Sequence, residues 1–128
     1  MTIFEGISAQ IDPQSTVIWN EGVTFTDIID IDSVVSDATG ADAIILCVGE
    51  PPEAEGEGNI NDLTLSAPQI ELYSALSELD IPIIVVLVEA RPRILGPIAD
   101  ANAILTCYLP GPIGGEAVAD ILFGKISP

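Results

Sequence analysis

Two uninterrupted apolar runs, residues 43–48 and 83–88, constrain the fold more than any other feature of the sequence. Each run is short and rich in β-branched residues, which favours a strand over a buried helix. Strands that are covered on both faces carry continuous apolar runs of this kind. A third run lies at residues 103–107, and segments with helical spacing separate the runs. The sequence therefore predicts an α/β fold, with a mostly parallel sheet and helices on both faces.

Helix signals flank these runs. Apolar residues at helical spacing predict a first helix over residues 3–11, and a last helix is expected over residues 115–123. Asp32 is a candidate cap for a second helix. Ser66 and Gln69 have the spacing of a capping box, which would begin a third helix.

The chain opens in a helix, and only the short β-rich run at residues 16–19 precedes the second helix. The first strand of a doubly wound sheet is normally an interior strand. We therefore expect an α/β sandwich that lacks its opening strand. A chain of 128 residues is long enough to bury a core, and we expect a single domain over residues 1–128 that is a fragment of a larger protein.

The charge balance restricts the partners. Twenty acidic residues face three basic ones, Arg91, Arg93 and Lys125, for a formal net charge of −17. Nucleic acid is excluded as a partner because phosphate binding needs clustered cations, and anionic membrane surfaces are disfavoured for the same reason. The apolar runs are too short to span a bilayer, and no export signal is present. We expect a soluble protein whose location the sequence does not fix.

The absence of histidine removes histidine-based triads and histidine zinc sites. Cys47 and Cys107 lie in apolar runs, where free cysteine acts as a small buried hydrophobe. Trp19 and Tyr108 also lie in or beside apolar runs, which favours core packing.

Three alternating glutamates, Glu53, Glu55 and Glu57, follow the run at residues 43–48 in a glycine-rich segment. Open α/β sheets bind ligands at the carboxyl ends of their strands, so these carboxylates are candidate site residues. A solvated loop is the alternative. A calcium loop would need a bidentate glutamate where Thr64 stands, and the glycines lack the dinucleotide spacing. We predict no metal and no cofactor.

A series of short motifs runs along nearly the whole chain. It comprises Thr-Ile-Phe-Glu-Gly-Ile at 2–7, Val-Gly-Glu at 48–50, Ala-Glu-Gly-Glu-Gly at 54–58, Asp-Leu-Thr-Leu at 62–65, Gln at 69, Val-Val-Leu-Val-Glu-Ala-Arg-Pro at 85–92, Tyr-Leu-Pro-Gly at 108–111 and Gly-Gly-Glu-Ala-Val-Ala-Asp-Ile-Leu-Phe-Gly at 114–124. Together and in this order they resemble the second, α/β-sandwich domain of glycoside hydrolase family 3.

The resemblance implies that the chain is part of an enzyme related to β-glucosidases, glucan glucohydrolases and β-xylosidases. In these enzymes a first, barrel domain supplies an aspartate nucleophile. The second domain supplies the acid/base glutamate, which falls here on Glu55. The substrate would be a β-glucoside or glucan bound through a barrel that this chain does not contain, so the chain would be inactive alone. Two positions depart from the pattern: Glu53 stands where an aromatic residue is frequent, and Ile113 replaces a glutamate.

We expect Glu53, Glu57 and Arg91 to contact the sugar, and the alternative for Arg91 is to pair with nearby acids. The alternative function is a non-enzymatic α/β module that binds a partner or assembles with itself as a homo-oligomer, with a second copy filling the gap in the sheet. A phosphoreceiver site at Glu50 would need a lysine after a late strand, and none is present.

Overall fold

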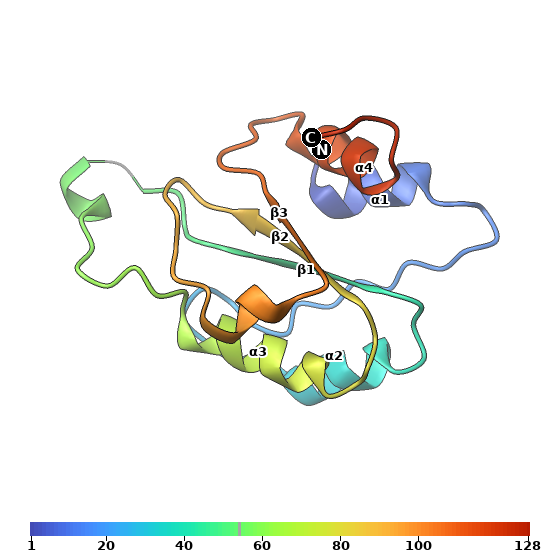
Figure 1. Cartoon of the computed structure of the whole chain (residues 1–128), viewed down its shortest axis with the longest axis horizontal. Coiled ribbons are helices and arrows are strands. Elements are labelled where there is room, and N and C mark those ends of the chain that lie inside the picture. Colours follow the sequence, from blue (N-terminus) through green and yellow to red (C-terminus); the bar gives the residue numbers. More distant parts are fainter. Residues whose placement is uncertain (54) are drawn as a thin grey trace. The chain divides into compact units, whose positions relative to one another are not determined.

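The structure, a computed structural model, describes residues 1–53 and 55–128, and the side chains of Glu55 and Glu57 lie outside its described part. The chain forms two compact units (Figure 1). The larger unit is Asn20–Tyr108, and the smaller one combines Met1–Trp19 with Leu109–Pro128. Within the described residues, no helix has the length and apolar character needed to cross a membrane.

The larger unit contains a sheet of three parallel strands, β1 (Ile44–Gly49), β2 (Ile83–Val88) and β3 (Ala103–Thr106). Their order in the sheet is β1-β2-β3. The three apolar runs of the sequence are therefore the three strands, and the predicted α/β fold is confirmed. The register aligns the ends of the first two strands, because Gly49 of β1 is paired with Val88 of β2.

Helices α2 (Ile31–Ala38) and α3 (Ala67–Ser77) and the 3₁₀ helix η2 (Gly96–Asp100) contribute to the core of this unit (Figure 1). Side chains alternate along a strand, so every second strand residue points to the same face. The buried core joins such residues to the helices, and its members are Leu46, Val48, Leu65, Leu72, Tyr73, Leu76, Ile83, Val85, Leu87 and Ile98. Removal of this apolar surface from water is the main force that holds the unit together.

The predicted cap of α2 was wrong, whereas Ser66 is the N-cap of α3 as predicted but lacks the predicted capping box. Helix α2 is capped by Asp30, whose carboxylate accepts a hydrogen bond from the Ser33 amide at 2.9 Å. Asp32 lies inside the first turn, where a carboxylate interacts favourably with the helix dipole. Helix α3 has no side-chain hydrogen bond at its cap, Ser66. Gln69 forms no capping box there because its amide group binds the end of β1.

The run at residues 16–19 was expected to be extended and β-rich, but it is not a strand. Among the described residues no neighbouring strand pairs with it, so its backbone lacks the hydrogen-bonding partner that a strand needs. Of the four residues expected to be buried, three are exposed and Cys107 is only half-buried. Trp19 is 63% exposed and Tyr108 is 59% exposed. Cys47 is also exposed, because it lies on the first strand of the sheet order and on the opposite face from Leu46.

The smaller unit is built on helices α1 (Ile3–Gln10) and α4 (Gly114–Leu122). A capping box begins α1, with the Glu5 amide donating to Thr2 Oγ1 and the Thr2 amide donating to Glu5 Oε2. The two helices approach closely through glycines. A β-carbon on Gly6 would overlap the backbone carbonyl of Gly115, so only hydrogen fits at this contact.

Gly6→Ala should therefore destabilise the smaller unit, although alanine is the better helix former by about 1 kcal/mol. The backbone clash requires the helices to separate, and overpacking of this kind costs about 1–3 kcal/mol. Thermal unfolding followed by circular dichroism measures the change. Ser8→Ala, at an exposed position of α1, is the matched control and should be neutral. A Gly6→Ala variant as stable as the Ser8→Ala variant would contradict the proposed close contact.

Candidate functional site

The segments that follow β1 and β2 lie against each other. An isolated parallel bridge joins Thr64 to Ile94. The Leu65 amide donates to the Ile94 carbonyl at 3.1 Å, and the Ile94 amide donates to the Leu63 carbonyl at 2.8 Å. The glutamate-bearing segment after β1 therefore returns along the segment after β2. Both lie at the carboxyl ends of parallel strands, which is where open α/β sheets bind ligands.

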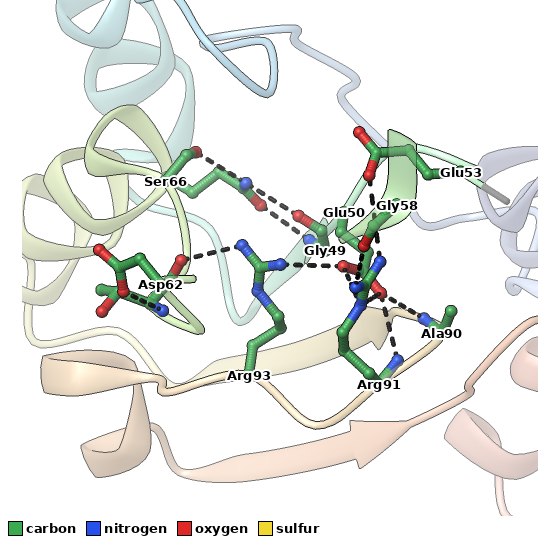
Figure 2. Close-up of polar contacts among 11 residues, drawn as sticks. Gly49, Glu50, Glu53, Gly58, Asp62, Ser66, Ala90, Arg91 and Arg93 are labelled. Carbon is green, nitrogen blue, oxygen red and sulfur yellow. Dashed lines mark hydrogen bonds and ion pairs between the residues drawn. The ribbon is translucent and has the colours of Figure 1, made fainter. Parts of the chain in front are cut away.

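The centre of this region is the carboxylate of Glu50, the first residue after β1 (Figure 2). Its side chain is only 4% exposed. Glu50 Oε1 accepts hydrogen bonds from the amides of Ala90 at 2.8 Å and Arg91 at 3.2 Å. Glu50 Oε2 lies 3.1 Å from Arg91 Nε and 2.9 Å from Arg93 Nη1. One carboxylate thus binds two of the three basic side chains of the protein.

Opposing effects act on the pKa of Glu50. Burial favours the neutral acid and raises the pKa, but hydrogen bonds from Ala90 and Arg91 together with the charge of Arg91 outweigh it. The net pKa is below the ordinary value of 4.5. Glu50 is therefore ionised at neutral pH, as its two ion pairs require.

The two arginines continue from Glu50 in different directions (Figure 2). Arg91 Nη1 donates to the carbonyl of Gly58, and Arg91 Nη2 lies 4.0 Å from Glu53 Oε2. Gly58 is the last residue of the short 3₁₀ helix η1 (Glu55–Gly58). Arg93 Nη2 donates to the carbonyl of Thr64 at 2.9 Å. The arginines therefore connect Glu50 to two separate points of the segment after β1.

Gln69 of α3 binds the backbone of Gly49, the last residue of β1. Its Oε1 accepts from the Gly49 amide at 2.7 Å, and its Nε2 donates to the Gly49 carbonyl at 3.0 Å. Nε2 also lies 2.9 Å from Ser66 Oγ. The side chain satisfies both backbone groups of the last β1 residue, which would otherwise be buried without partners.

Glu89, the first residue after β2, is a second carboxyl beside this network. It is 3% exposed, and its Oε2 has no hydrogen-bond partner among the described residues. Burial raises its pKa, and the charge of Glu50 raises it further, against the opposing effect of Arg93.

A pocket of about 350 Å³ also lies beside Glu50, Gln69 and Cys47.

The structure places two of the four predicted site residues. Glu53 is exposed at the edge of the network. Arg91 pairs with acids, which was the alternative expected for it. Glu55 and Glu57 belong to η1, but their side chains lie outside the described part, so the predicted roles of these two glutamates remain predictions.

The sequence argument considered Glu50 only as a phosphoreceiver site, and it missed Glu89 and the role of Gln69. A signal was available, because Glu50 and Glu89 each stand directly after a strand. The rule that drew attention to the alternating glutamates applies more directly to these two positions.

Comparison with known proteins identifies the family. The model of the glycosyl hydrolase family 3 C-terminal domain matches residues 1–128. The chain belongs to glycoside hydrolase family 3. A lysosomal β-glucosidase of Dictyostelium discoideum is 38% identical over 123 residues, which cover 94% of this chain and 15% of that protein. A β-xylosidase of Formosa agariphila is 30% identical over 138 residues, covering 100% of this chain and 18% of that protein.

Solved structures agree with this family assignment. A family 3 β-glucosidase of Bifidobacterium adolescentis superposes with a TM-score of 0.86 at 30% identity, covering 100% of this chain and 19% of that one. The chain thus spans less than a fifth of the length of these relatives. It corresponds to the C-terminal domain of the family.

Glu50→Gln should destabilise the domain at neutral pH by about 3 kcal/mol, because it leaves two guanidinium groups without their carboxylate. A pKa below the ordinary value means that the contribution of Glu50 is complete well above pH 4.5 and disappears as the pH falls through the folded-state pKa. Urea unfolding at pH 7 and at successively lower pH values should therefore show a difference from wild type that narrows on acidification.

Glu71→Gln, at an exposed position of α3, removes the same charge without touching the network. It should unfold at the wild-type urea concentration at pH 7. Equal stability of Glu50→Gln and Glu71→Gln at pH 7 would show that the network contributes nothing to the fold.

Proposed function

We propose that this chain is part of a glycosidase acting on β-linked glucosides or glucans, to which it contributes Glu55 as the general acid/base of a retaining mechanism. The observation that carries the proposal is the match of the entire chain to the family 3 C-terminal domain. The position of η1 supports it, because Glu55 begins this helix in the segment that follows β1, at the edge of the sheet where ligands bind.

Retaining hydrolysis requires two carboxyl groups about 5–5.5 Å apart. One attacks the anomeric carbon, and the other protonates the leaving oxygen and later activates a water molecule. Glu55 would perform the second task. The nucleophile would come from a barrel domain outside these 128 residues, so we expect no turnover by the chain alone.

The sugar contacts predicted for Glu53, Glu57 and Arg91 are part of the same proposal. Glu53 is exposed, and within the described part of the chain its carboxylate has one ion-pair contact, the 4.0 Å approach of Arg91 Nη2. Its carboxylate can therefore accept hydrogen bonds from sugar hydroxyl groups. Arg91 Nη2 has no shorter contact among the described residues and can donate to the same ligand.

A chimeric enzyme tests the acid/base role. Residues 1–128 would replace the corresponding segment of the Bifidobacterium adolescentis β-glucosidase, which matches the whole chain. Glu55→Gln in this chimera should lower kcat about 10²–10⁴-fold for an aryl glucoside with a poor leaving group. On kcat/KM, which reports only the first, glycosylation step, the loss should be large for that substrate and small for a dinitrophenyl glucoside, because the dinitrophenyl leaving group needs no proton.

Glu53→Gln and Glu57→Gln are the matched controls, and neither should show this dependence on the leaving group. An equal loss of kcat/KM on both substrates in Glu55→Gln would argue against a general-acid role. Separately, steady hydrolysis by the isolated chain that is abolished by Glu55→Gln would contradict the need for a second domain.

A second candidate function is a non-enzymatic module that assembles with itself. Strand β1 is first in the sheet order, and the described residues provide no strand on its other side. Ile45 of β1 is 36% exposed. An open strand edge with apolar side chains can pair with another chain.

Light scattering over a range of protein concentrations tests this alternative. The charge of −17 on each copy opposes association, so association should strengthen with added salt, which screens the repulsion. Ile45→Lys should reverse it. A chain that stays monomeric at every concentration and salt level would exclude self-assembly.

A further inference from the structure

The segment after β1 has little regular structure to hold a catalytic side chain. Between Glu50 and Ser66, the helix η1 is its only regular helix or strand in the described part of the chain. Its glycine at position 56 has open space where a side chain would stand. A catalytic group must be held to within about 0.5 Å, so side chains from elsewhere in the fold must fix this helix.

The described contacts fix η1 at its last residue. Gly58 is buried, whereas Gly56 and Asn59 on either side of it are exposed. The Gly58 carbonyl accepts a hydrogen bond from Arg91, which lies 33 positions further along the chain. Directly after the helix, the Asn59 amide donates to the Gly56 carbonyl at 3.2 Å and so closes its last turn. The amide of Asn59 therefore reports whether the helix is formed.

Arg91 is itself held rigidly. Its Nε and its backbone amide both bind the Glu50 carboxylate, which Arg93 and the Ala90 amide hold from other directions. A guanidinium group is planar and offers donors at both ends. Its Nε end can therefore remain on Glu50 while its Nη1 reaches Gly58. A lysine has one ammonium group and cannot make both contacts in the same way.

We propose that Glu50 and Arg91 are positioning residues that fix η1, and with it the backbone of Glu55, against the end of β2. This inference rests on the proposed function for its catalytic consequence. Its structural part concerns residues that the structure describes and can be tested in the isolated chain. Arg93 provides a matched control because it binds the same Glu50 carboxylate but connects it to Thr64 and not to η1.

Amide hydrogen exchange in the 128-residue chain measures the structural part. Arg91→Lys and Arg91→Gln should lower the protection of the Asn59 amide about tenfold, the effect of one lost charge-assisted hydrogen bond. Amides of β2 should keep their protection, which verifies that the variants are folded. Arg93→Lys should leave Asn59 unchanged. Undiminished Asn59 protection in folded Arg91 variants would overturn the inference.

Kinetics in the chimeric enzyme measure the catalytic part. Arg91→Lys should lower kcat about ten- to a hundredfold on the poor leaving group, a larger factor than any rise in KM from a lost sugar contact, because a displaced acid affects the transition state more than substrate binding. A rise in KM with unchanged kcat would mean that Arg91 only contacts the sugar and would overturn the positioning role.

The two proposals fail in different ways. If Glu55→Gln lowers kcat as expected and Arg91→Lys does not, the positioning inference is wrong and the acid/base assignment stands. If Glu55→Gln leaves kcat unchanged, the assignment of Glu55 is wrong, and the catalytic part of the inference is wrong with it. The exchange data on Asn59 are independent of both kinetic results.

Discussion

The ionised carboxylate of Glu50 is the interaction on which the site region depends. Parallel strands are joined by long crossovers, so the segments that follow two neighbouring strands share no turn to align them. Here one carboxylate receives backbone amides from the segment after β2 and the side chains of Arg91 and Arg93. Through these arginines it reaches Gly58 and Thr64. A single buried anion thereby joins the two segments, in addition to the backbone bridge between Thr64 and Ile94.

The cost of burying charge explains the composition of this cluster. Desolvation makes a buried ion pair a modest net contributor to stability, but removing one partner is expensive because the other charge is left uncompensated. The cluster around Glu50 has two guanidinium groups and a second carboxyl, Glu89, whose pKa is raised by burial and by the charge of Glu50. These groups favour one arrangement of the strand ends over alternatives in which a charge is left unpaired.

Much of the fold could be predicted from the sequence, because each of the three strands coincides with a continuous apolar run. Failures arose where a residue's role depends on a partner distant in the chain. Gln69 has the sequence signature of a cap, yet it binds Gly49, which lies 20 positions away. Glu50 meets Arg91 only because β1 and β2 pair in one register. Residues 16–19 have β propensity but no pairing strand among the described residues. Local patterns do not contain this information.

The contact between Gly6 and Gly115 also affects the order of folding. Helix α1 packs against α4, and the Gln10 side chain donates to Asp120 across 110 positions of sequence. The larger unit, by contrast, is continuous in the chain. On the ribosome α1 must therefore wait for the synthesis of residues 11–122 before its partner exists, and a helix of eight residues is marginal by itself. Until then its apolar side chains stay available to chaperones, and the sheet can form first.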